Sequence, residues 1–418
     1  MKLKILFFAL LLLAACRETT MEEPYMAIEI RSQLGDVLLS GNPIWVDTDD
    51  GGSQPAGSTN YQHLLRIVST DGALIGSPMI DAIAPEADHM AHFNIQGRVD
   101  QDVDYDFQFP QQNLVTAFPL LAFDITLEAG ERYVDSNGDL QTSWSGVTES
   151  HRILKGGISR LITQDIQPYR FYDDFIRAGR FLTWQAPDMK ISPDTPLMLW
   201  YIYPPESYGA NVELRITVFR NNEVGYSDEK VYEITLLPDN LYAFNLSLDV
   251  LGLTTTHATY GNVTGITAGI YSSGVLKSEL RSWFYDLRNY DENTYIAFKN
   301  SLSGVDCLWC TGKLTEILST EKSVSARPDL PTINHKRATQ VVSSVQGQRK
   351  WELNTGHKSK EDLSAMRDFA LSDQMWLLRD TYVIPVYLEN RDHVLAQISR
   401  NLDDISITLL EGHIENKY

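Results

Sequence analysis

The sequence predicts a mainly β protein, made of tandem antiparallel β-sandwich domains followed by a C-terminal β-rich unit that contains one helix. Three observations predict this class. Short runs rich in Val, Ile, Leu, Thr, Tyr and Phe recur along the chain. Gly, Pro, Asn and Asp interrupt these runs at intervals of roughly ten residues, and apolar residues at helical spacing are scarce. This pattern is typical of immunoglobulin-like or fibronectin-like sandwiches.

Residues 1–15 are predicted to be a lipoprotein signal peptide. Lys2 and Lys4 precede an apolar run that is far shorter than the roughly 20 residues needed to span a bilayer. Cys16 follows directly on Leu13-Ala14-Ala15, which resembles the bacterial lipobox. We therefore expect a diacylglyceryl group on the Cys16 thiol, which would anchor the protein to a membrane. The alternative is an ordinary signal peptide with a coincidental cysteine.

Residues 16–25 form an acidic tether after the lipidated position. No aspartate follows Cys16, which favours the outer membrane over retention at the inner membrane. Glu18, Glu22 and Glu23 resemble, weakly, the acidic signal of surface-displayed lipoproteins of Bacteroidota. The tether thus favours surface display over the periplasmic face, and a plain solvated linker is the alternative.

Three β-rich units are expected after the tether. A first sandwich is predicted for residues 26–150, a bridging segment for 151–178 and a second sandwich for 179–289. Within the first, Asp135-Ser136-Asn137-Gly138-Asp139 predicts a hairpin, because Asn-Gly supplies the positive φ of a tight turn. The clearest strand patterns cover residues 26–31, 62–69, 120–127, 213–220, 230–236 and 262–271.

The third unit, residues 290–418, differs by containing a helix. Ser359 and Asp362 have the spacing of a capping box, and Leu363, Met366 and Ala370 then share one face. The pattern predicts a helix over about residues 360–371. Strands are expected on either side of it, the later ones at residues 376–378, 382–388 and 405–410.

Composition excludes one class of partner. The 418 residues carry a formal charge of −20, and without residues 1–15 the chain has 33 basic and 55 acidic residues, a charge of −22. This charge repels nucleic acid, and no basic stripe with interleaved aromatics offsets it. At 43% hydrophobic residues, the chain has material for several cores.

Cys307 and Cys310 form a C-x-x-C in a compartment where disulfides can form. A redox site needs this motif at a strand-to-helix turn, but the surrounding residues read as strand. Residues three apart in a strand point to opposite faces, so the thiols would meet only at a bulge or turn. This favours structural or unpaired cysteines over a local disulfide, and either of these over redox catalysis.

Several loops carry possible metal ligands. Asp135, Asn137 and Asp139 alternate oxygen ligands as a calcium loop does, but Gly138 is fourth rather than sixth as in an EF-hand, which favours a plain hairpin turn. Asp47, Asp49 and Asp50 form a second acidic loop, for which a solvated loop is favoured. His89 and His92 lack the further ligands that a zinc site requires.

No catalytic constellation emerges from the sequence. The serine-nucleophile, P-loop and dinucleotide fingerprints are absent, and Gly156-Gly157-Ile158-Ser159 does not match a nucleophile elbow. Carboxylates are numerous, but no spacing singles out the pair that a glycosidase needs. No cofactor is expected.

Aromatic clusters are the best candidates for a sugar-binding surface, because flat rings stack on pyranose faces. Trp200, Tyr201, Tyr203 and Tyr208 form one cluster. Alternate aromatics in a sandwich are more often core than platform, so core packing is the favoured interpretation. A second cluster contains Tyr169, Phe171, Tyr172 and Phe175.

A further set of segments in the C-terminal unit carries a resemblance: residues 295–306 followed by Gly312-Lys313, together with residues 351–356, the predicted helix, 376–378 and 40–44. These segments resemble β-rich surface lipoproteins and phage-tail-like structural proteins of Bacteroidota. Cys307, Cys310 and the lipid signal depart from the pattern. The resemblance implies extracellular or virion scaffolding and attachment, with no catalytic residues to carry over.

Together these features predict a lipid-anchored, non-catalytic structural or adhesion protein of the cell envelope, acting within a larger assembly. Its expected partners are the membrane, through the lipid, and envelope or surface proteins. The alternative is a glycan-binding surface lipoprotein of a polysaccharide-uptake system. A glycoside hydrolase is the third class and rests on fold analogy alone.

Overall fold

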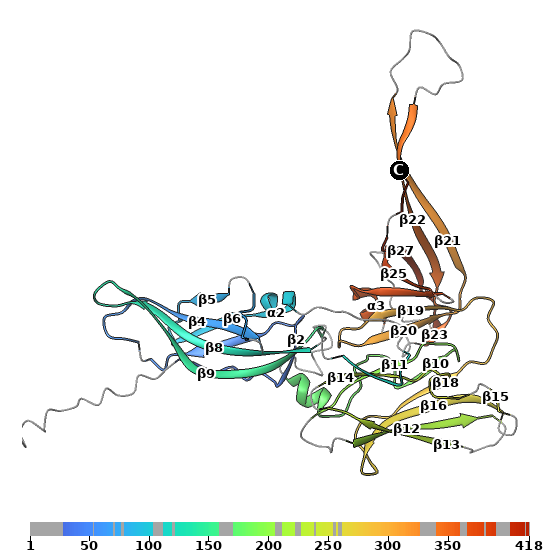
Figure 1. Ribbon diagram of the computed structural model, residues 1–418, viewed down its shortest axis with the longest axis horizontal. Coiled ribbons are helices and arrows are strands. Elements are labelled where there is room, and N and C mark those ends of the chain that lie inside the picture. Colours follow the sequence, from blue (N-terminus) through green and yellow to red (C-terminus); the bar gives the residue numbers. More distant parts are fainter. Residues whose placement is uncertain are drawn as a thin grey trace, which may run out of the picture. The chain divides into compact units, whose positions relative to one another are not determined.

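The computed structural model confirms a mainly β protein built of antiparallel sheets (Figure 1). It describes residues 28–418 except for 53, 70–71, 77–78, 103–111, 119–121, 159–169, 205–210, 222–226, 238–239, 254–255, 258–260, 327–339, 360–365, 380–381, 390–401, 414 and 418. Among the described residues, no helix combines the length and the apolar character needed to cross a membrane.

The described chain forms two compact units. Unit 1 contains residues up to 36, 43–102 and 124–152, and unit 2 contains 37–42, 103–123 and 153–418. The segments predicted as a second sandwich and a C-terminal domain thus belong to one unit. Two stretches inside the predicted first sandwich, 37–42 and 103–123, also belong to unit 2.

Unit 1 is a sandwich of two antiparallel sheets. One sheet has the order β1 (Glu29–Ile30), β3 (Trp45–Asp49), β6 (Met90–Asn94). The other contains β9 (Leu140–Leu154), β8 (Ala122–Val134), β4 (Thr59–Ser69) and β5 (Ile80–Ile83) in this order, while β2 (Val37–Leu39) belongs to unit 2. Alternate residues of β4 and β8 are buried, as expected for strands with one face on a core. A short helix, α2 (Gln96–Asp102), follows β6.

Unit 2 begins with a sheet that is buried on both faces. Its order is β11 (Met198–Ile202), β14 (Leu241–Asn245), β7 (Val115–Ala117), and every residue of β11 and β14 is buried. Leu199, Tyr201 and Phe244 point into one core, whereas Trp200 and Ala243 point into another. The sheet is therefore a middle layer, which explains its continuous apolar runs.

A larger sheet covers the first of these faces. Its order is β10 (Asp188–Ile191), β18 (Arg281–Tyr285), β16 (Gly261–Ser272), β12 (Asn211–Arg220), β13 (Ser227–Thr235). Two short strands, β15 (Thr256–His257) and β17 (Val275–Leu276), also pair with β16. The β10–β18 pair is parallel, an exception to the antiparallel expectation.

A third sheet covers the opposite face of the middle layer. Its order is β20 (Val305–Cys310), β19 (Thr294–Lys299), β24 (Met375–Arg379), β25 (Tyr382–Leu388), β27 (Ser406–Glu411), β22 (Gln340–Asn354), β21 (Leu314–Ala326). β28 (Glu415–Lys417) adds to β22, and β23 (Lys358–Ser359) pairs with β26 (Leu402–Asp403). The far face of this sheet forms its own core with Trp351 and Phe369.

The helices of unit 2 are short. α3 (Met366–Leu371) confirms a helix in the C-terminal unit, while residues 360–365 of the predicted helix lie outside the described residues. Met366 and Phe369 point from it into the core. The bridging segment contains a π-helix, η3 (Tyr172–Ile176), which buries Tyr172 and Phe175. Phe171 and Phe175, two residues of the second aromatic cluster, are stacked on each other in the core that also contains Trp200.

Candidate functional site

A cleft of unit 2 encloses about 600 Å³ beside the start of β19 and of β21. Its acidic groups are Asp194, Asp291, Glu292 and Glu316. Arg379 contributes one cation and forms an ion pair with Glu316 at 2.7 Å. Carboxylates and a guanidinium are the groups that orient polar ligands in binding sites. Sequence reasoning did not single out this cleft, because its residues come from four separate segments.

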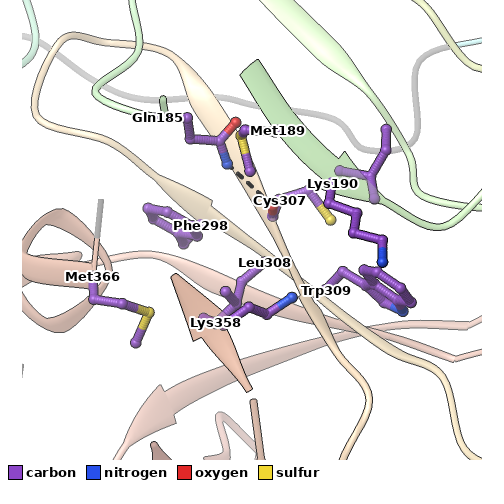
Figure 2. Close-up of a pocket in the computed structure, with 10 residues that line it drawn as sticks. Gln185, Met189, Lys190, Phe298, Cys307, Leu308, Trp309, Lys358 and Met366 are labelled. Atoms are coloured by element: carbon purple, nitrogen blue, oxygen red, sulfur yellow. Dashed lines mark hydrogen bonds between the residues drawn. The ribbon is translucent and has the colours of Figure 1, made fainter. Parts of the chain in front are cut away.

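A second, smaller cavity adjoins the cysteine motif (Figure 2). It holds about 20 Å³, the space of about one water molecule. Cys307 and Trp309 of β20 line it, and the Lys358 ammonium lies 4.7 Å from the centroid of the Trp309 ring. The amide of Gln185 donates a hydrogen bond of 3.1 Å to the backbone oxygen of Cys307. The cavity is too small for a substrate larger than water.

Both cysteines of the motif are free thiols, so the disulfide considered for Cys307 and Cys310 is not formed. The two residues lie in β20, where they face opposite sides of the sheet: Cys307 packs against the core of the middle layer and Cys310 lies in the core containing Trp351. Burial raises the pKa of the Cys307 thiol well above its usual range and that of Cys310 to about 12. Neither is a thiolate near neutral pH, which disfavours redox chemistry.

The turn between β19 and β20 is held by the side chain of a buried asparagine, Asn300. Asn300 Oδ1 accepts hydrogen bonds from the backbone N–H groups of Leu302 and Gly304, each at 2.9 Å. Its Nδ2 donates to the carbonyl oxygen of Leu182 at 2.8 Å and to Asp306 Oδ2 at 3.1 Å. This turn belongs to the segment that carries the resemblance, and its side chains bind the protein's own backbone.

Two buried carboxylates flank that turn. Burial raises the pKa of Asp306 to about 7, although hydrogen bonds from Thr183 and Asn300 oppose the shift. Asp368 has a raised pKa for the same reason, and its Oδ2 accepts hydrogen bonds from the N–H and hydroxyl of Ser301, both at 2.9 Å. Shifted carboxylates can mark catalytic acids. These two, however, line neither cavity described above and are held by internal donors.

The proposed sugar-stacking aromatics are core residues. Trp200, Tyr201 and Tyr203 are at most 1% exposed. Trp200 and Tyr201 are neighbours and point to opposite faces of β11, yet both are buried because β11 lies in a middle layer. Rings buried in this way have no face for a sugar, so this assignment is wrong for these three. Tyr208 lies outside the described residues.

The proposed calcium ligands form a hairpin turn between β8 and β9. The Asp135 carboxylate accepts hydrogen bonds from the backbone N–H groups of Asn137 and Asp139, and Gly138 has a φ of 88°. These hydrogen bonds lower the pKa of Asp135. Across the part of the chain that the structure describes, no group of three or more His, Cys, Asp or Glu residues is placed to hold a metal ion.

Unit 1 contains a buried polar network that the sequence did not reveal. His63 Nδ1 lies 2.7 Å from Thr48 Oγ1, and its Nε2 lies 3.4 Å from Asp50 Oδ2. The order hydroxyl, imidazole, carboxylate is that of a nucleophile relay. All three residues are at most 2% exposed, so no substrate reaches the hydroxyl. Burial lowers the pKa of His63, against the opposing effect of Asp50.

The acidic loop and the histidine pair noted in the sequence are neighbours across two strands. β3 pairs with β6 in a register that sets Asp47 opposite His92. His92 Nδ1 lies 2.7 Å from Asp47 Oδ1, and this hydrogen bond raises the pKa of His92. His89 Nδ1 lies 3.6 Å from Asp50 Oδ1. Asp47 is thus hydrogen-bonded to His92 rather than freely solvated, and the register of β3 and β6 places these two residues opposite each other.

The long strands β21 and β22 form a ribbon that is exposed over most of β21. Its strands pair from Leu314↔Leu353 to Ala326↔Gln340 and extend away from the sheet body (Figure 1). From Glu316 onward every residue of β21 is exposed. Leu318, Val324 and Val342 lie on one face of this ribbon and are 60%, 54% and 48% exposed. Val324 and Val342 lie directly opposite each other, whereas Thr320 and Lys322 separate them from Leu318. Adjoining exposed apolar side chains are found at surfaces that contact other proteins.

The expected anchor lies outside the described residues. The structure describes neither Cys16 nor the tether 16–25, so their lipidation and acidic signal stay predictions.

Comparisons with known proteins give no family. No protein-family model matches the sequence, and no curated protein matches it. Among solved structures, the extracellular region of plexin A4 aligns at 7% identity and a TM-score of 0.16, covering 62% of this chain and 25% of plexin. The eight N-terminal immunoglobulin domains of Down syndrome cell adhesion molecule align at 8% identity and 0.15, covering 93% and 53%. A variant of Salmonella alpha-2-macroglobulin aligns at 9% and 0.17, covering 88% and 24%.

TM-scores below 0.2 carry no argument about topology, partners or activity. The chain spans about a quarter to a half of the length of each of these proteins. The class of this protein, mainly β with several antiparallel sheets, therefore rests on its own strands.

Proposed function

We propose that the protein is a lipid-anchored, non-catalytic structural or adhesion protein of the cell envelope, and that it works through protein contacts made by the β21–β22 ribbon. The lipobox at Cys16 supports the anchor. The observation that carries the contact role is the exposure of the ribbon on both faces. A two-stranded ribbon is marginally stable by itself, so its length adds little to the fold. Its apolar face supports a role in contact with a partner.

The test removes the ribbon and keeps the body. Residues 319–348 are replaced by Asn-Gly, a turn that suits a two-residue hairpin loop between the opposed Leu318 and Arg349. Trp351 and Leu353 stay in place, so the core that they form is kept. The deletion also removes residues 345–347, which pair with β28, and the hydrogen bonds of Gln348 to Tyr387 and Glu411. We therefore expect a somewhat lower melting temperature with a cooperative unfolding transition retained, and the loss of envelope-protein adducts when intact cells are crosslinked. The same adducts in the shortened variant would rule out the ribbon as the contact element.

A matched control addresses the apolar face separately. Leu318→Ser and Val324→Ser both change exposed side chains on the face that is proposed to bind. Leu280→Ser changes a side chain that is 46% exposed on the segment before β18, away from the ribbon strands. The ribbon variants should weaken crosslinking, whereas Leu280→Ser should leave it intact.

The second candidate is glycan binding, which the 600 Å³ cleft favours. Its carboxylates and the guanidinium of Arg379 could hydrogen-bond sugar hydroxyls. Asp291→Asn and Asp194→Asn change exposed carboxylates that line the cleft. If glycans bind here, the two variants will elute earlier than the unmodified protein from a polysaccharide gel. Equal elution of all three, with no retardation relative to a non-binding protein, would discard this candidate.

A further inference from the structure

β21 leaves one edge of its sheet open. It is the last strand in the sheet order, and among the described residues no strand pairs with its outer edge. About half of its backbone N–H and C=O groups point to that side. Proteins usually block such an edge with proline, a bulge or several lysines, or keep it short. β21 has 13 residues, no proline and one lysine, Lys322. The register shift near Ser323 adds the extra residue to β22, so β21 itself stays regular.

The side chains of β21 are complementary to themselves. Two copies of one strand that pair antiparallel about a two-fold axis must have one residue opposite its own equivalent. With Ser319 at that centre, Glu316 lies opposite Lys322 of the second copy, and Lys322 lies opposite Glu316. Within β21 this is the only two-fold register that places the lysine opposite a carboxylate.

The same register also matches two further pairs: Leu314 lies opposite Val324 of the second copy, and Thr315 lies opposite Ser323. The pairs next to the centre are mixed, because Ile317 lies opposite Glu321 and Leu318 lies opposite Thr320. Residues 315 to 324 gain a partner strand, while the backbone N–H of Leu314 already donates a hydrogen bond to the Glu292 carboxylate. Glu316 already contacts Arg379 at 2.7 Å, and its side chain is 42% exposed, which leaves room for a second cation.

We propose that two copies of this chain associate by antiparallel pairing of their β21 edges, centred on Ser319, with Glu316 and Lys322 forming two reciprocal ion pairs. The pairing would join two ribbons into a four-stranded sheet with no exposed β21 edge. The inference deepens the proposed function and rests on it for the role of the ribbon as the contact element. It names the first partner in the assembly as a second copy of the protein.

Single cysteines in the full chain on intact cells test the register. Directly opposed residues have Cβ atoms about 5 Å apart, within disulfide reach. Ser319→Cys should therefore give a disulfide-linked species of twice the chain mass under mild oxidation. Ser323→Cys is the matched control, because Ser323 is an exposed serine on the same face of β21. Its equivalent would lie about 27 Å away, eight residues along the strand, so it should stay monomeric.

Charge exchange gives an independent readout. Glu316→Lys and Lys322→Glu each place like charges opposite each other and should reduce the co-purification of two differently tagged copies. Mixing the two variants restores both ion pairs, so the mixed pair should co-purify as well as the unmodified protein does. Glu321→Lys and Lys313→Glu carry the same charge changes at positions opposite Ile317 and Ser325, and they should have little effect.

The outcomes separate this inference from the proposed function. Ser319→Cys linked to a different protein would overturn self-pairing and keep the ribbon as a contact element. If the Ser319→Cys protein stays monomeric, and removal of the ribbon leaves the crosslinking to envelope proteins unchanged, both the self-pairing and the contact role of the ribbon are overturned. Equal dimer yields at Ser319 and Ser323, or no recovery in the mixed charge variants, would overturn the proposed register.

Discussion

The indole N–H of Trp200 donates a hydrogen bond of 3.0 Å to the backbone oxygen of Val305, 105 residues away in the sequence. This bond joins β11 of the middle layer to β20 of the neighbouring sheet. The indole of Trp200 also lies close to the backbone of Gly304. A Cβ added at Gly304 would lie 3.0 Å from the indole Cγ and 2.7 Å from the Leu182 oxygen. A residue that the sequence offered as a sugar platform thus holds two layers together.

Replacing Trp200 tests this structural role. Trp200→Phe keeps an aromatic ring but leaves the buried oxygen of Val305 without this donor and opens a cavity. We expect a loss of about 2–4 kcal/mol in the free energy of unfolding, measured by urea titration. Tyr382→Phe, at a position 71% exposed, should change it by less than about 0.5 kcal/mol. A loss of similar size in both variants would contradict the assignment.

Because the pKa of Asp306 is raised, we expect the folded protein to lose stability as the pH rises. The Asp306 pKa of about 7 in the folded protein exceeds the ordinary value of 3.8, so folding favours the protonated acid. The unfolded chain releases its proton near pH 4, and stability then falls until the pH passes about 7. Three pKa units correspond to at most about 4 kcal/mol.

Asp306→Asn removes this titration and keeps an oxygen that can accept from Asn300. Urea titrations at pH 5, 6, 7 and 8 should show that the unmodified protein loses more stability over this range than Asp306→Asn does. Asp368 titrates in the same direction and stays in both proteins, so part of the slope remains. Parallel curves for the two proteins would show that Asp306 is not protonated in the folded state.

Because the pKa of His63 is lowered, we expect unit 1 to lose stability as the pH falls. Burial lowers the pKa of His63 below 6.5, so the unfolded chain takes up a proton that the folded protein resists. Stability is therefore lost as the pH falls below 6.5. His63→Asn should lower the melting temperature of unit 1 at pH 7.5, because Thr48 and Asp50 lose contacts, but the further drop at pH 5.5 should be smaller than in the unmodified protein.

His92 supplies a control of opposite sign. Its pKa is raised by Asp47, so its contribution to stability is present below pH 6.5 and is lost as the pH rises through the folded value. His92→Asn should therefore make unit 1 more sensitive to acid than the unmodified protein. The effect should be small, because the His92 side chain is 38% exposed. The same acid response in both histidine variants would argue against these assignments.

The cysteine thiols should be nearly inert in the folded protein. Only thiolates react with iodoacetamide, and a rise in the pKa of Cys310 from 9.0 to about 12 lowers its thiolate fraction about a thousandfold. Mass spectrometry at pH 8 should show slow labelling of Cys307 and Cys310 without urea and fast labelling in 8 M urea. A mass two units lower without reductant would instead reveal a disulfide.

The sequence by itself determined the local structure. Strands form near residues 62–69, 213–220 and 262–271 because alternating β-branched and aromatic residues suit a pleated surface. The 135–139 turn follows from Asn-Gly, and the helix at Met366–Leu371 from apolar spacing. Each of these signals involves neighbouring residues, so no knowledge of the rest of the chain is needed to recognise it.

Tertiary structure decided the environment of each residue. Trp200 and Tyr201 are both buried because other sheets cover both faces of β11. The five residues of β11 do not alternate between apolar and polar, so their sequence does not show which face is covered. The contact of Thr48 with His63 arises from two sheets facing each other. The open edge of β21 arises from its place at the end of the sheet order. Burial, pKa and exposure depend on contacts between distant segments, and these exist only once the layers have packed.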